Sequence, residues 1–200
     1  MRTIVSAVAL LTLAAACASG PQSQQGPGGP GGRPGGRPGT LNPSSTPAPG
    51  ANNTTARADV HDANGQSLGV LTLTQTPHGV LIVGDLTGLP AGIHALHVHE
   101  SGRCEPPFTS AGGHLNLAPH THGVKSAQGP HNGDLANFNA PASGPAHIEQ
   151  ISRDLTMATG PVGMFDADGA SLVVHQGADD YSSDPAGNAG PRIACGSIAR

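Results

Sequence analysis

From residue 57 to the C-terminus, short segments rich in Val, Ile, Leu and Thr alternate with segments rich in Gly, Pro, Asn and Asp. Runs of this kind predict strands, and the polar segments between them predict turns. No stretch shows the sustained 3.6-residue apolar period of an amphipathic helix. The expected strands are residues 57–61, 68–76, 80–86, 93–100, 134–139, 146–151, 171–176 and 193–198. The pattern predicts an all-β domain built as a sandwich or flattened barrel.

Two connections in this pattern are too long for hairpin turns. They cover about residues 101–133 and 177–191. Long ordered loops on a β scaffold are frequent carriers of binding and catalytic side chains. We therefore expect the functional site in or beside these two loops.

The N-terminal segment, residues 1–17, has the pattern of a secretory signal. Arg2 precedes an apolar run over residues 4–16, which ends in small residues before Cys17. The run is too short to span a bilayer as a stop-transfer helix. Its end resembles the lipobox of bacterial lipoproteins, whose cysteine is lipidated, although Ala14 stands where leucine is usual. We expect export and a lipid anchor on Cys17; cleavage nearby without lipidation is the alternative.

Residues 18–55 are dominated by Gly, Pro, Ser, Gln, Asn and Thr. Such a composition buries too little apolar surface to offset chain entropy, which predicts a disordered linker. As a Gly-rich coil it would span roughly 35 Å, a suitable tether between a membrane and a folded domain. Residues 56–200 are long enough for one domain with a core of its own.

The predicted domain is acidic. Residues 56–200 carry six Lys and Arg against thirteen Asp and Glu side chains, a net charge of about −7. No basic stripe is present to contact phosphates, which argues against a nucleic-acid-binding protein. No large apolar stripe marks a subunit interface, so monomer and homodimer both remain open.

Cys104 and Cys195 are the two cysteines that remain when Cys17 is assigned to the lipobox. In an oxidising compartment such a pair is expected to form a disulfide, and two free thiols are the alternative. The bridge would close a loop of about 90 residues and stabilise the fold by roughly 4–5 kcal/mol in the chain-entropy model.

Histidine is unusually common: eleven His exceed the nine Lys and Arg together. His97 and His99 are two apart on an expected strand, so both rings project from the same face. Alone, such a pair is more often a surface feature than a pair of metal ligands. A second cluster lies in the Gly-rich loop and its end: His114, His122, His131 and Asp134.

The two clusters suit two different metals. Three imidazoles and a carboxylate from His114, His122, His131 and Asp134 form a closed tetrahedral set of the kind zinc prefers. The all-nitrogen set His97, His99, His114 and His175 suits a tetragonal Cu(II) site. His114 belongs to both sets, and a deprotonated imidazole can bind one metal through each ring nitrogen. The spacing thus predicts two ions bridged by His114.

One zinc ligand has a competitor, because His120 lies two residues before His122. The eight-residue step from His114, the nine-residue step to His131 and the following glycine favour His122. We expect His94 to support the strand and its adjoining loop.

Five segments together are similar to the signature segments of the copper/zinc superoxide dismutase family: residues 92–99 (GIHALHVH), 112–116 (GGHLN), 131–136 (HNGDLA), 172–180 (LVVHQGADD) and 188–196 (NAGPRIACG). The resemblance covers nearly all of residues 56–200. It implies an eight-stranded Greek-key β-barrel or sandwich, immunoglobulin-like, with one copper and one zinc on the two sets above. It also implies an enzyme that dismutates superoxide.

The resemblance assigns further roles. Asp179 matches a carboxylate that links a copper histidine to a zinc histidine. Arg192 matches the arginine at the mouth of the copper channel, and Cys104 with Cys195 matches the disulfide within the subunit. His114 and Arg192 would be the catalytic residues. With the N-terminal signal, the family implies protection of the cell envelope or periplasm from superoxide.

The chain departs from the family pattern in one respect. The 177–191 loop is short and has no lysine, and Lys125 is the sole lysine in the chain. The expected charged guidance residues are therefore missing, which puts substrate steering in doubt. Two other functions are compatible with a β-sandwich: a non-catalytic envelope protein that stores or delivers copper or zinc, and an adhesion module without tightly bound metal.

Overall fold

The computed structural model describes residues 54–200. The expected signal segment, Cys17 and nearly all of the expected linker lie outside the described residues. No helix within residues 54–200 has the length and apolar character needed to cross a membrane.

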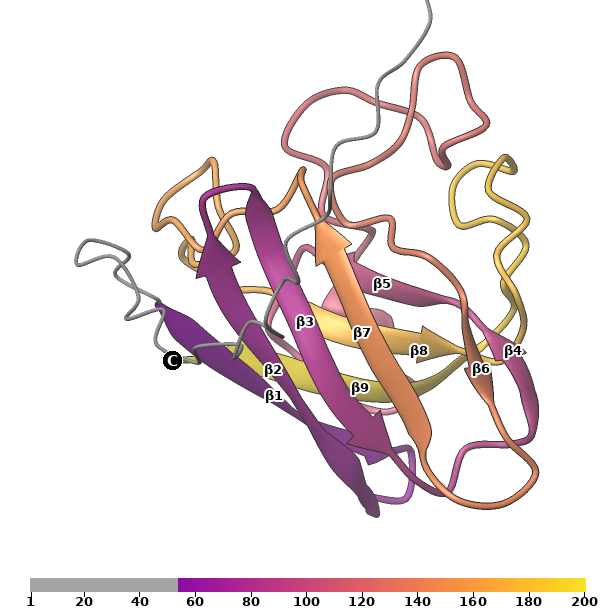
Figure 1. Ribbon diagram of the computed structural model, residues 1–200. Helices are drawn as coiled ribbons and strands as arrows, with labels where there is room; N and C mark the ends of the chain where they lie inside the picture. The colour runs from indigo at the N-terminus through magenta and orange to yellow at the C-terminus, as the bar shows by residue number, and fades with distance from the viewer. Residues whose placement is uncertain (1–53) are drawn as a thin grey trace, which may run out of the picture. The chain divides into compact units, whose positions relative to one another are not determined.

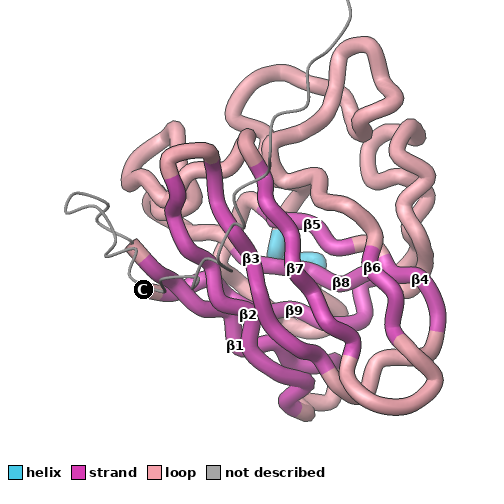
Figure 2. Tube along the Cα trace, viewed as in Figure 1, coloured by secondary structure: helices cyan, strands magenta, loops and turns pink. Residues whose placement is uncertain are grey.

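The described chain is all-β, as the sequence predicts (Figures 1 and 2). The strands are β1 (Thr55–Asp62), β2 (Ser67–Thr76), β3 (Gly79–Leu86), β4 (Gly92–His94), β5 (Leu96–His99), β6 (Phe138–Ala140), β7 (Ala146–Ser152), β8 (Ser171–His175) and β9 (Arg192–Ala199). One short 3₁₀ helix, η1 (Thr109–Ala111), lies in the first long loop.

Seven strands form one antiparallel sheet in the order β5-β8-β9-β1-β2-β3-β7, and β4 pairs with β6 in a second, two-stranded sheet. Figure 1 shows the large sheet curled around its core. The curl follows the twist that every β-sheet carries. The order of strands in the sheet differs from their order in the chain, since β9, the last strand, pairs with β1, the first.

The inner face of the curled sheet forms the hydrophobic core. In β1, Ala56, Ala58 and Val60 are buried while the residues between them are exposed or half-buried. This alternation is the two-residue period of a half-buried strand. The buried side chains of the strands thus form the core on one face of the sheet.

Strands β5 and β8 are buried on both faces. Leu96 and Val98 point into the core, so His97 and His99 lie on the outer face of β5. Strand β8 pairs antiparallel with β5 and ends at His175. All four residues of β5 and all five of β8 are buried. The outer face of these two strands is therefore covered as well, by the long loops.

Two expected strands need correction. The segment 93–100 is not continuous: β4 pairs with β6 and β5 with β8, and between them the Ala95 N–H donates to Gly177 O at 2.8 Å. The structure therefore has nine strands where eight were expected. The segment 134–139 contributes only β6, because Asp134 turns away to a single bridge with His97.

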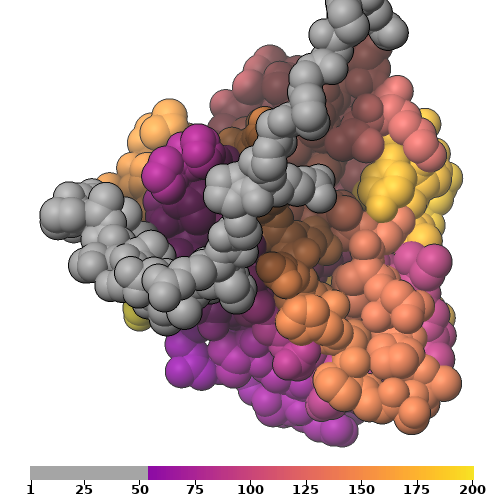
Figure 3. Space-filling model, viewed as in Figure 1, coloured from indigo at the N-terminus to yellow at the C-terminus, as the bar shows by residue number. Residues whose placement is uncertain are grey.

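The two long loops lie against each other. The His122 N–H donates to Asp184 Oδ1 at 2.8 Å, and the Lys125 N–H donates to Tyr181 O at 3.0 Å. In Figure 3 the 177–191 loop (yellow) forms a surface patch next to the pink residues of the first loop. The loops thereby enclose the outer face of β5, where the histidines lie.

Candidate metal centre

The first histidine group joins residues from three parts of the fold. His97 and His99 come from β5, His175 from the end of β8, and His114 from the loop that forms a single bridge with His99. One ligand atom from each ring lies within 4.8 Å of the others. All four are buried: His97 and His99 are 0% exposed, His175 is 3% exposed and His114 is 7% exposed.

Hydrogen bonds to the protein fix the tautomers of three of these rings. His99 Nδ1 donates to Gly112 O at 3.1 Å, and His175 Nδ1 donates to Gly190 O at 3.1 Å. His97 uses its other nitrogen, since Nε2 donates to Asp179 Oδ2 at 3.0 Å. The nitrogens left free are Nε2 of His99 and His175 and Nδ1 of His97, each with a lone pair available for a metal.

The second group gathers around one carboxylate oxygen. Asp134 Oδ1 lies 2.8 Å from His114 Nδ1, 3.1 Å from His122 Nδ1 and 3.3 Å from His131 Nδ1. The other oxygen, Oδ2, accepts the backbone N–H groups of Gly123 and His131. Three nitrogens and one fixed carboxylate oxygen form a four-ligand set, the number that a structural zinc site requires.

His114 belongs to both groups. Its Nδ1 faces Asp134 in the second group. Its Nε2 is buried and has no protein partner, and its ring centroid lies 4.0 Å from that of His97 and 4.9 Å from that of His99. One ring therefore offers a nitrogen to each group, as the sequence predicts.

Within residues 54–200, six buried side-chain nitrogen or oxygen atoms lack a hydrogen-bond partner, and all six are imidazole nitrogens: His97 Nδ1, His99 Nε2, His114 Nε2, His122 Nδ1, His131 Nδ1 and His175 Nε2. Unpaired buried polar atoms are costly and rare in native proteins. Two metal ions would give each of the six nitrogens a partner. This is the strongest argument that these residues are built to hold copper and zinc.

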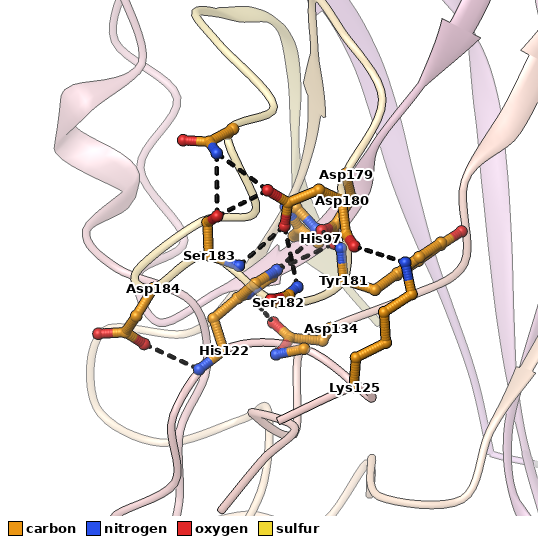
Figure 4. A network of polar contacts seen from close by, with 12 residues as sticks. His97, His122, Lys125, Asp134, Asp179, Asp180, Tyr181, Ser182, Ser183 and Asp184 are labelled. Carbon is orange, nitrogen blue, oxygen red and sulfur yellow. Dashed lines mark hydrogen bonds and ion pairs between the residues drawn. The ribbon is translucent and has the colours of Figure 1, made fainter. Parts of the chain in front are cut away.

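Asp179 links the two groups (Figure 4). Its Oδ2 accepts His97 Nε2–H, and its Oδ1 accepts His122 Nε2–H at 2.9 Å. Asp179 also forms a compact cluster with these two rings. Its contacts are hydrogen bonds to the ring nitrogens that do not face the metal groups, so Asp179 orients both rings.

The sequence did not point to several residues that hold this network. Asp184 accepts the His122 N–H, Tyr181 Oη accepts the Asn137 N–H at 2.8 Å, and Asn137 Nδ2 donates to Asp179 O at 2.9 Å. These contacts join segments more than 40 residues apart. No local pattern in the sequence carries a signal for them.

Lys125 belongs to the first long loop and contacts the second one. Its Nζ donates to Asp180 O at 2.9 Å and sits 5.4 Å from the centre of the Tyr181 ring (Figure 4). It does not line the cavity at His114. The sole lysine of the chain therefore does not replace the missing guidance lysine at the metal centre.

Arg192 lies at the opening of the site. A cavity of about 280 Å³ is lined by Arg192, His114, His131 and Glu100, among others. The guanidinium donates from Nη1 to Phe108 O at 2.7 Å and from Nη2 to Gly112 O at 2.6 Å. A fixed cation thus faces the same opening as the shared ring.

The remaining histidines near the site are structural. His94 is buried, and its Nδ1 and Nε2 lie 2.9 Å from His175 O and 2.8 Å from Pro90 O. It ties β4 to the end of β8, in line with the expected supporting role. His120 is exposed, its Nδ1 contacts Pro130 O, and it belongs to neither ligand group, so the choice of His122 is confirmed.

The disulfide between Cys104 and Cys195 is present, as expected. It ties the start of the first long loop to β9, three residues after Arg192. Phe108, whose carbonyl holds Arg192, packs with Cys195, Ala111 and Val173 in a small apolar cluster under this loop. The bridge therefore supports the segment that anchors the arginine.

Burial keeps three rings of the first group, those of His99, His114 and His175, neutral in the metal-free protein. Desolvation, followed by repulsion from neighbouring charges, lowers the pKa of His99 to about 2 and that of His175 to about 3. Desolvation likewise lowers the pKa of His114 to about 4, although Asp134 opposes the shift. Neutral imidazoles are the form that binds metals.

His122 behaves in the opposite way. Burial disfavours its charge, but the contacts with Asp134 and Asp179 outweigh burial and raise its pKa to about 9. Hydrogen bonds from His114 and His122 hold the pKa of Asp134 well below the usual carboxylate range, against its desolvation. Hydrogen bonds from His122 and His97 do the same for the pKa of Asp179. A metal ion in the second group must therefore displace a proton from His122.

These shifts predict a stability maximum near pH 6.5 for the metal-free protein. Unfolding returns each ring to a pKa of about 6.5. Below that pH the unfolded chain binds more protons through His99, His114 and His175, so stability falls as the pH falls. Above it, the native state binds the extra proton on His122, so stability falls as the pH rises toward 9.

The measurement is urea unfolding of the metal-free protein at pH 5, 6.5 and 8.5. The free energy of unfolding should be highest at the middle value. A free energy that rises steadily from pH 5 to pH 8.5 would show that His122 has no raised pKa in the folded protein.

Gly187 leaves room for the Asp179–His122 contact. Gly187 has φ +63°, and a Cβ built on it would lie 1.8 Å from Asp179 Oδ1 and 2.7 Å from His122 Nε2. We expect Gly187→Ala to displace the carboxylate and to weaken zinc binding about 10- to 100-fold, the usual cost of losing such a partner. Competition with a zinc chelator measures this loss.

Gly144→Ala is the matched control. Gly144 also has a positive φ, +87°, but a Cβ there would meet no atom within 4 Å. Both variants therefore strain the backbone, and only Gly187→Ala crowds the metal centre. Equal zinc affinities in the two variants would contradict the role given to the Asp179–His122 contact.

The comparisons with known proteins agree with this geometry. Residues 67–198 match the family model described as copper/zinc superoxide dismutase (SODC). The chain is 42% identical over 144 residues to superoxide dismutase [Cu-Zn] 1 of Aquifex aeolicus, covering 70% of this chain and 85% of that protein. It is 44% identical over 147 residues to the superoxide dismutase [Cu-Zn] of Caulobacter vibrioides, covering 72% and 84%.

A solved structure shares the fold. The Cu/Zn superoxide dismutase from Brucella abortus superposes with a TM-score of 0.60 at 27% identity, over 72% of this chain and 99% of that chain. The likeness places the curled antiparallel sheet described above among copper/zinc superoxide dismutase barrels. With both ligand sets intact, a copper set of His97, His99, His114 and His175 and a zinc set of His114, His122, His131 and Asp134, the chain belongs to the copper/zinc superoxide dismutase family.

Proposed function

We propose that this protein dismutates superoxide, converting two superoxide anions and two protons into dioxygen and hydrogen peroxide. The observation that carries the proposal is the set of six buried, unpartnered imidazole nitrogens, arranged in two groups that share His114. Such a set costs stability unless metals occupy it. A protein selected only to fold would not retain it.

Copper held by His97, His99, His114 and His175 would supply the one-electron chemistry, whereas zinc has no accessible second redox state and would order the loops. Zinc would bind His114, His122, His131 and Asp134. Asp179 orients one ring of each set through its two oxygens. The carbonyls of Gly112 and Gly190 orient two further rings in the same way.

His114 is placed to move a proton. Its Nδ1 is directed to the zinc set, which leaves Nε2 as the atom that can accept and release a proton. That atom faces the copper set in a site that opens beside Arg192. Forming peroxide needs two protons, and a ring at this position can deliver one of them.

Arg192 would attract and orient the anionic substrate. Among the residues that line the cavity it is the one arginine or lysine, and two backbone carbonyls fix its guanidinium. Lys125 is held elsewhere. In an acidic domain, attraction of superoxide would then depend on Arg192 and the metal ions themselves.

Arg192→Ala should therefore lower kcat/KM about tenfold while both metals stay bound, within the range expected for electrostatic steering. The dependence of the rate on salt should also weaken. Arg153→Ala removes an exposed arginine that lines a different surface groove and should leave the rate unchanged. Equal rates and equal salt dependence in the two variants would argue against a guidance role for Arg192.

We also propose that the chain has three parts: a signal segment over residues 1–17, a linker over 18–55 and the dismutase domain over 56–200. Export followed by lipidation of Cys17 would place the domain in the cell envelope, where it would protect against extracytoplasmic superoxide. The disulfide supports an oxidising compartment. The domain would act as a monomer or homodimer.

The test is a superoxide-decay assay on purified protein, with a copper and zinc count on the same sample. We expect one copper, one zinc and rapid decay. Protein that holds both metals but leaves superoxide decay at the uncatalysed rate would instead indicate metal storage or delivery. The mass of the mature N-terminal peptide would show separately whether Cys17 carries lipid.

A further inference from the structure

Glu100 places a negative charge in an opening that should admit an anion. It directly follows β5, is exposed, and lines the cavity of about 280 Å³ together with Arg192 and His114. A carboxylate at this position repels superoxide, so by charge alone it works against entry of the substrate. Its contacts indicate a second role, in holding the groups that surround the opening.

Glu100 makes two hydrogen bonds with Gly113. The Glu100 N–H donates to Gly113 O at 3.0 Å, and Glu100 Oε1 accepts the Gly113 N–H at 2.8 Å. Gly112 permits this close approach: it has φ +77°, and a Cβ built on it would lie 2.7 Å from both Cγ and Oε1 of Glu100. The carboxylate is therefore packed directly against the backbone of residues 112 and 113.

The Gly113 N–H belongs to the same peptide group as Gly112 O. That carbonyl accepts Arg192 Nη2–H at 2.6 Å and His99 Nδ1–H at 3.1 Å. A trans peptide group is planar, so a contact that fixes its N–H also fixes the direction of its C=O. A carboxylate binds one end of this peptide group and a guanidinium the other, and hydrogen bonds to charged partners are the strong ones. The two bonds polarise the peptide group in the same sense.

We propose that Glu100 is a positioning residue that clamps the Gly112–Gly113 peptide group and thereby holds Arg192 and His99 in place. Its effect on the guidance of an anion rests on the proposed dismutase function, whereas the clamp is a property of the folded chain. Loss of the clamp would let the peptide group rotate. Arg192 would then keep only its bond to Phe108 O as a firm anchor, and His99 would lose the fixed acceptor of its Nδ1–H.

The charge of Glu100 also acts on Arg192. Burial lowers the pKa of Arg192, and the negative charge of Glu100 opposes this shift. Removal of the carboxylate therefore has two effects: an anion is repelled less, and the peptide group loses its clamp. Glutamine separates the two effects, because its amide oxygen can still accept the Gly113 N–H but carries no charge. Alanine removes both the charge and the acceptor.

The first measurement is the affinity of the full-length protein, loaded with copper and zinc, for azide, a small anion that binds Cu(II), followed by optical titration. Glu100→Gln should bind azide as tightly as the wild type or up to about threefold more tightly, since a repelling charge is gone. Glu100→Ala should bind it about three- to tenfold more weakly, since a charge-assisted bond that fixes the peptide group beside Arg192 is lost. Charge alone would give both variants the same affinity, and that result would overturn the proposal.

The second measurement is the electron paramagnetic resonance spectrum of Cu(II) in the same samples, which reports on the orientation of His99. Glu100→Ala should change the copper hyperfine splitting, and Glu100→Gln should keep the wild-type spectrum. A wild-type spectrum in Glu100→Ala would refute the clamp. Neither measurement requires turnover, so loaded protein that fails to dismutate superoxide would refute the proposed function and still test the clamp.

Glu105→Ala is the matched control. Glu105 lies in the same loop, and its exposed carboxylate pairs with Arg103 Nη2 at 2.8 Å and does not line the cavity. The variant changes the charge of the loop by the same amount without touching the Gly112–Gly113 peptide group, so it should keep the azide affinity and the spectrum of the wild type. Equal losses in Glu105→Ala and Glu100→Ala would contradict a specific role for Glu100.

Discussion

His114→Ala is expected to lower the rate of superoxide dismutation by about 1,000-fold or more, well beyond the 10- to 100-fold usual for loss of an outer partner of a ligand. The variant removes one ligand from each metal set at once. It also removes Nε2, the atom proposed to carry a proton. We expect the purified variant to lose the one-to-one content of copper and zinc.

His120→Ala is the control for this prediction. His120 lies in the same loop, is exposed, and contacts only groups of that loop. It should keep both metals and a rate within about twofold of the wild type, as expected for an exposed residue outside the ligand sets. A His114→Ala protein with full metal content and a near-normal rate would show that the two sets do not depend on a shared ring.

Removal of the disulfide is expected to have the largest effect on stability. Cys104 and Cys195 are 91 residues apart, and in the chain-entropy model a loop of this size stabilises the fold by about 4–5 kcal/mol. The double variant Cys104→Ser and Cys195→Ser avoids leaving a free thiol behind. Its free energy of unfolding, measured in urea without metals, should fall by that amount.

The wild-type protein with the disulfide reduced and alkylated provides the comparison, and it should unfold at nearly the same urea concentration as the double variant. The loss should also be visible with both metals bound, because the bridge and the metals restrain different parts of the loop. A difference below about 1 kcal/mol would mean that the loop is already ordered in the unfolded or reduced chain.

Most of the fold follows from local patterns in the sequence. The short segments rich in Val, Ile, Leu and Thr and the turn residues between them predict an all-β domain, and that prediction is confirmed. The break at Ala95 was not predictable, because it arises where one continuous expected strand, residues 93–100, exchanges its partner from β6 to β8. Only the tertiary arrangement contains that information.

The metal ligands were predictable because their chemistry is rare and their spacing is regular. His97 and His99 share a face by strand geometry, and Asp134 follows His131 by three residues. Apart from His94, which was expected to support its strand, and Asp179, which the resemblance assigned, the supporting residues were not predictable. Asp184 and Gly187 act on His122 from a loop about 60 residues away, and Asp and Gly are common in loops simply because they favour turns.

The position of Lys125 shows the same limit. From the sequence, the sole lysine could have served as the cation near the substrate opening. In the structure its Nζ is occupied by Asp180 O and the Tyr181 ring, so it joins the two long loops. Arg192 is left as the protein cation at the cavity.

The most direct test of a centre built on one shared ring is a crystal structure of the protein loaded with copper and zinc, with anomalous data collected at the absorption edges of both metals. We predict a copper peak at Nε2 of His114 and a zinc peak at Nδ1 of the same ring. A single metal peak, or two peaks of which neither contacts His114, would contradict the shared-ring centre.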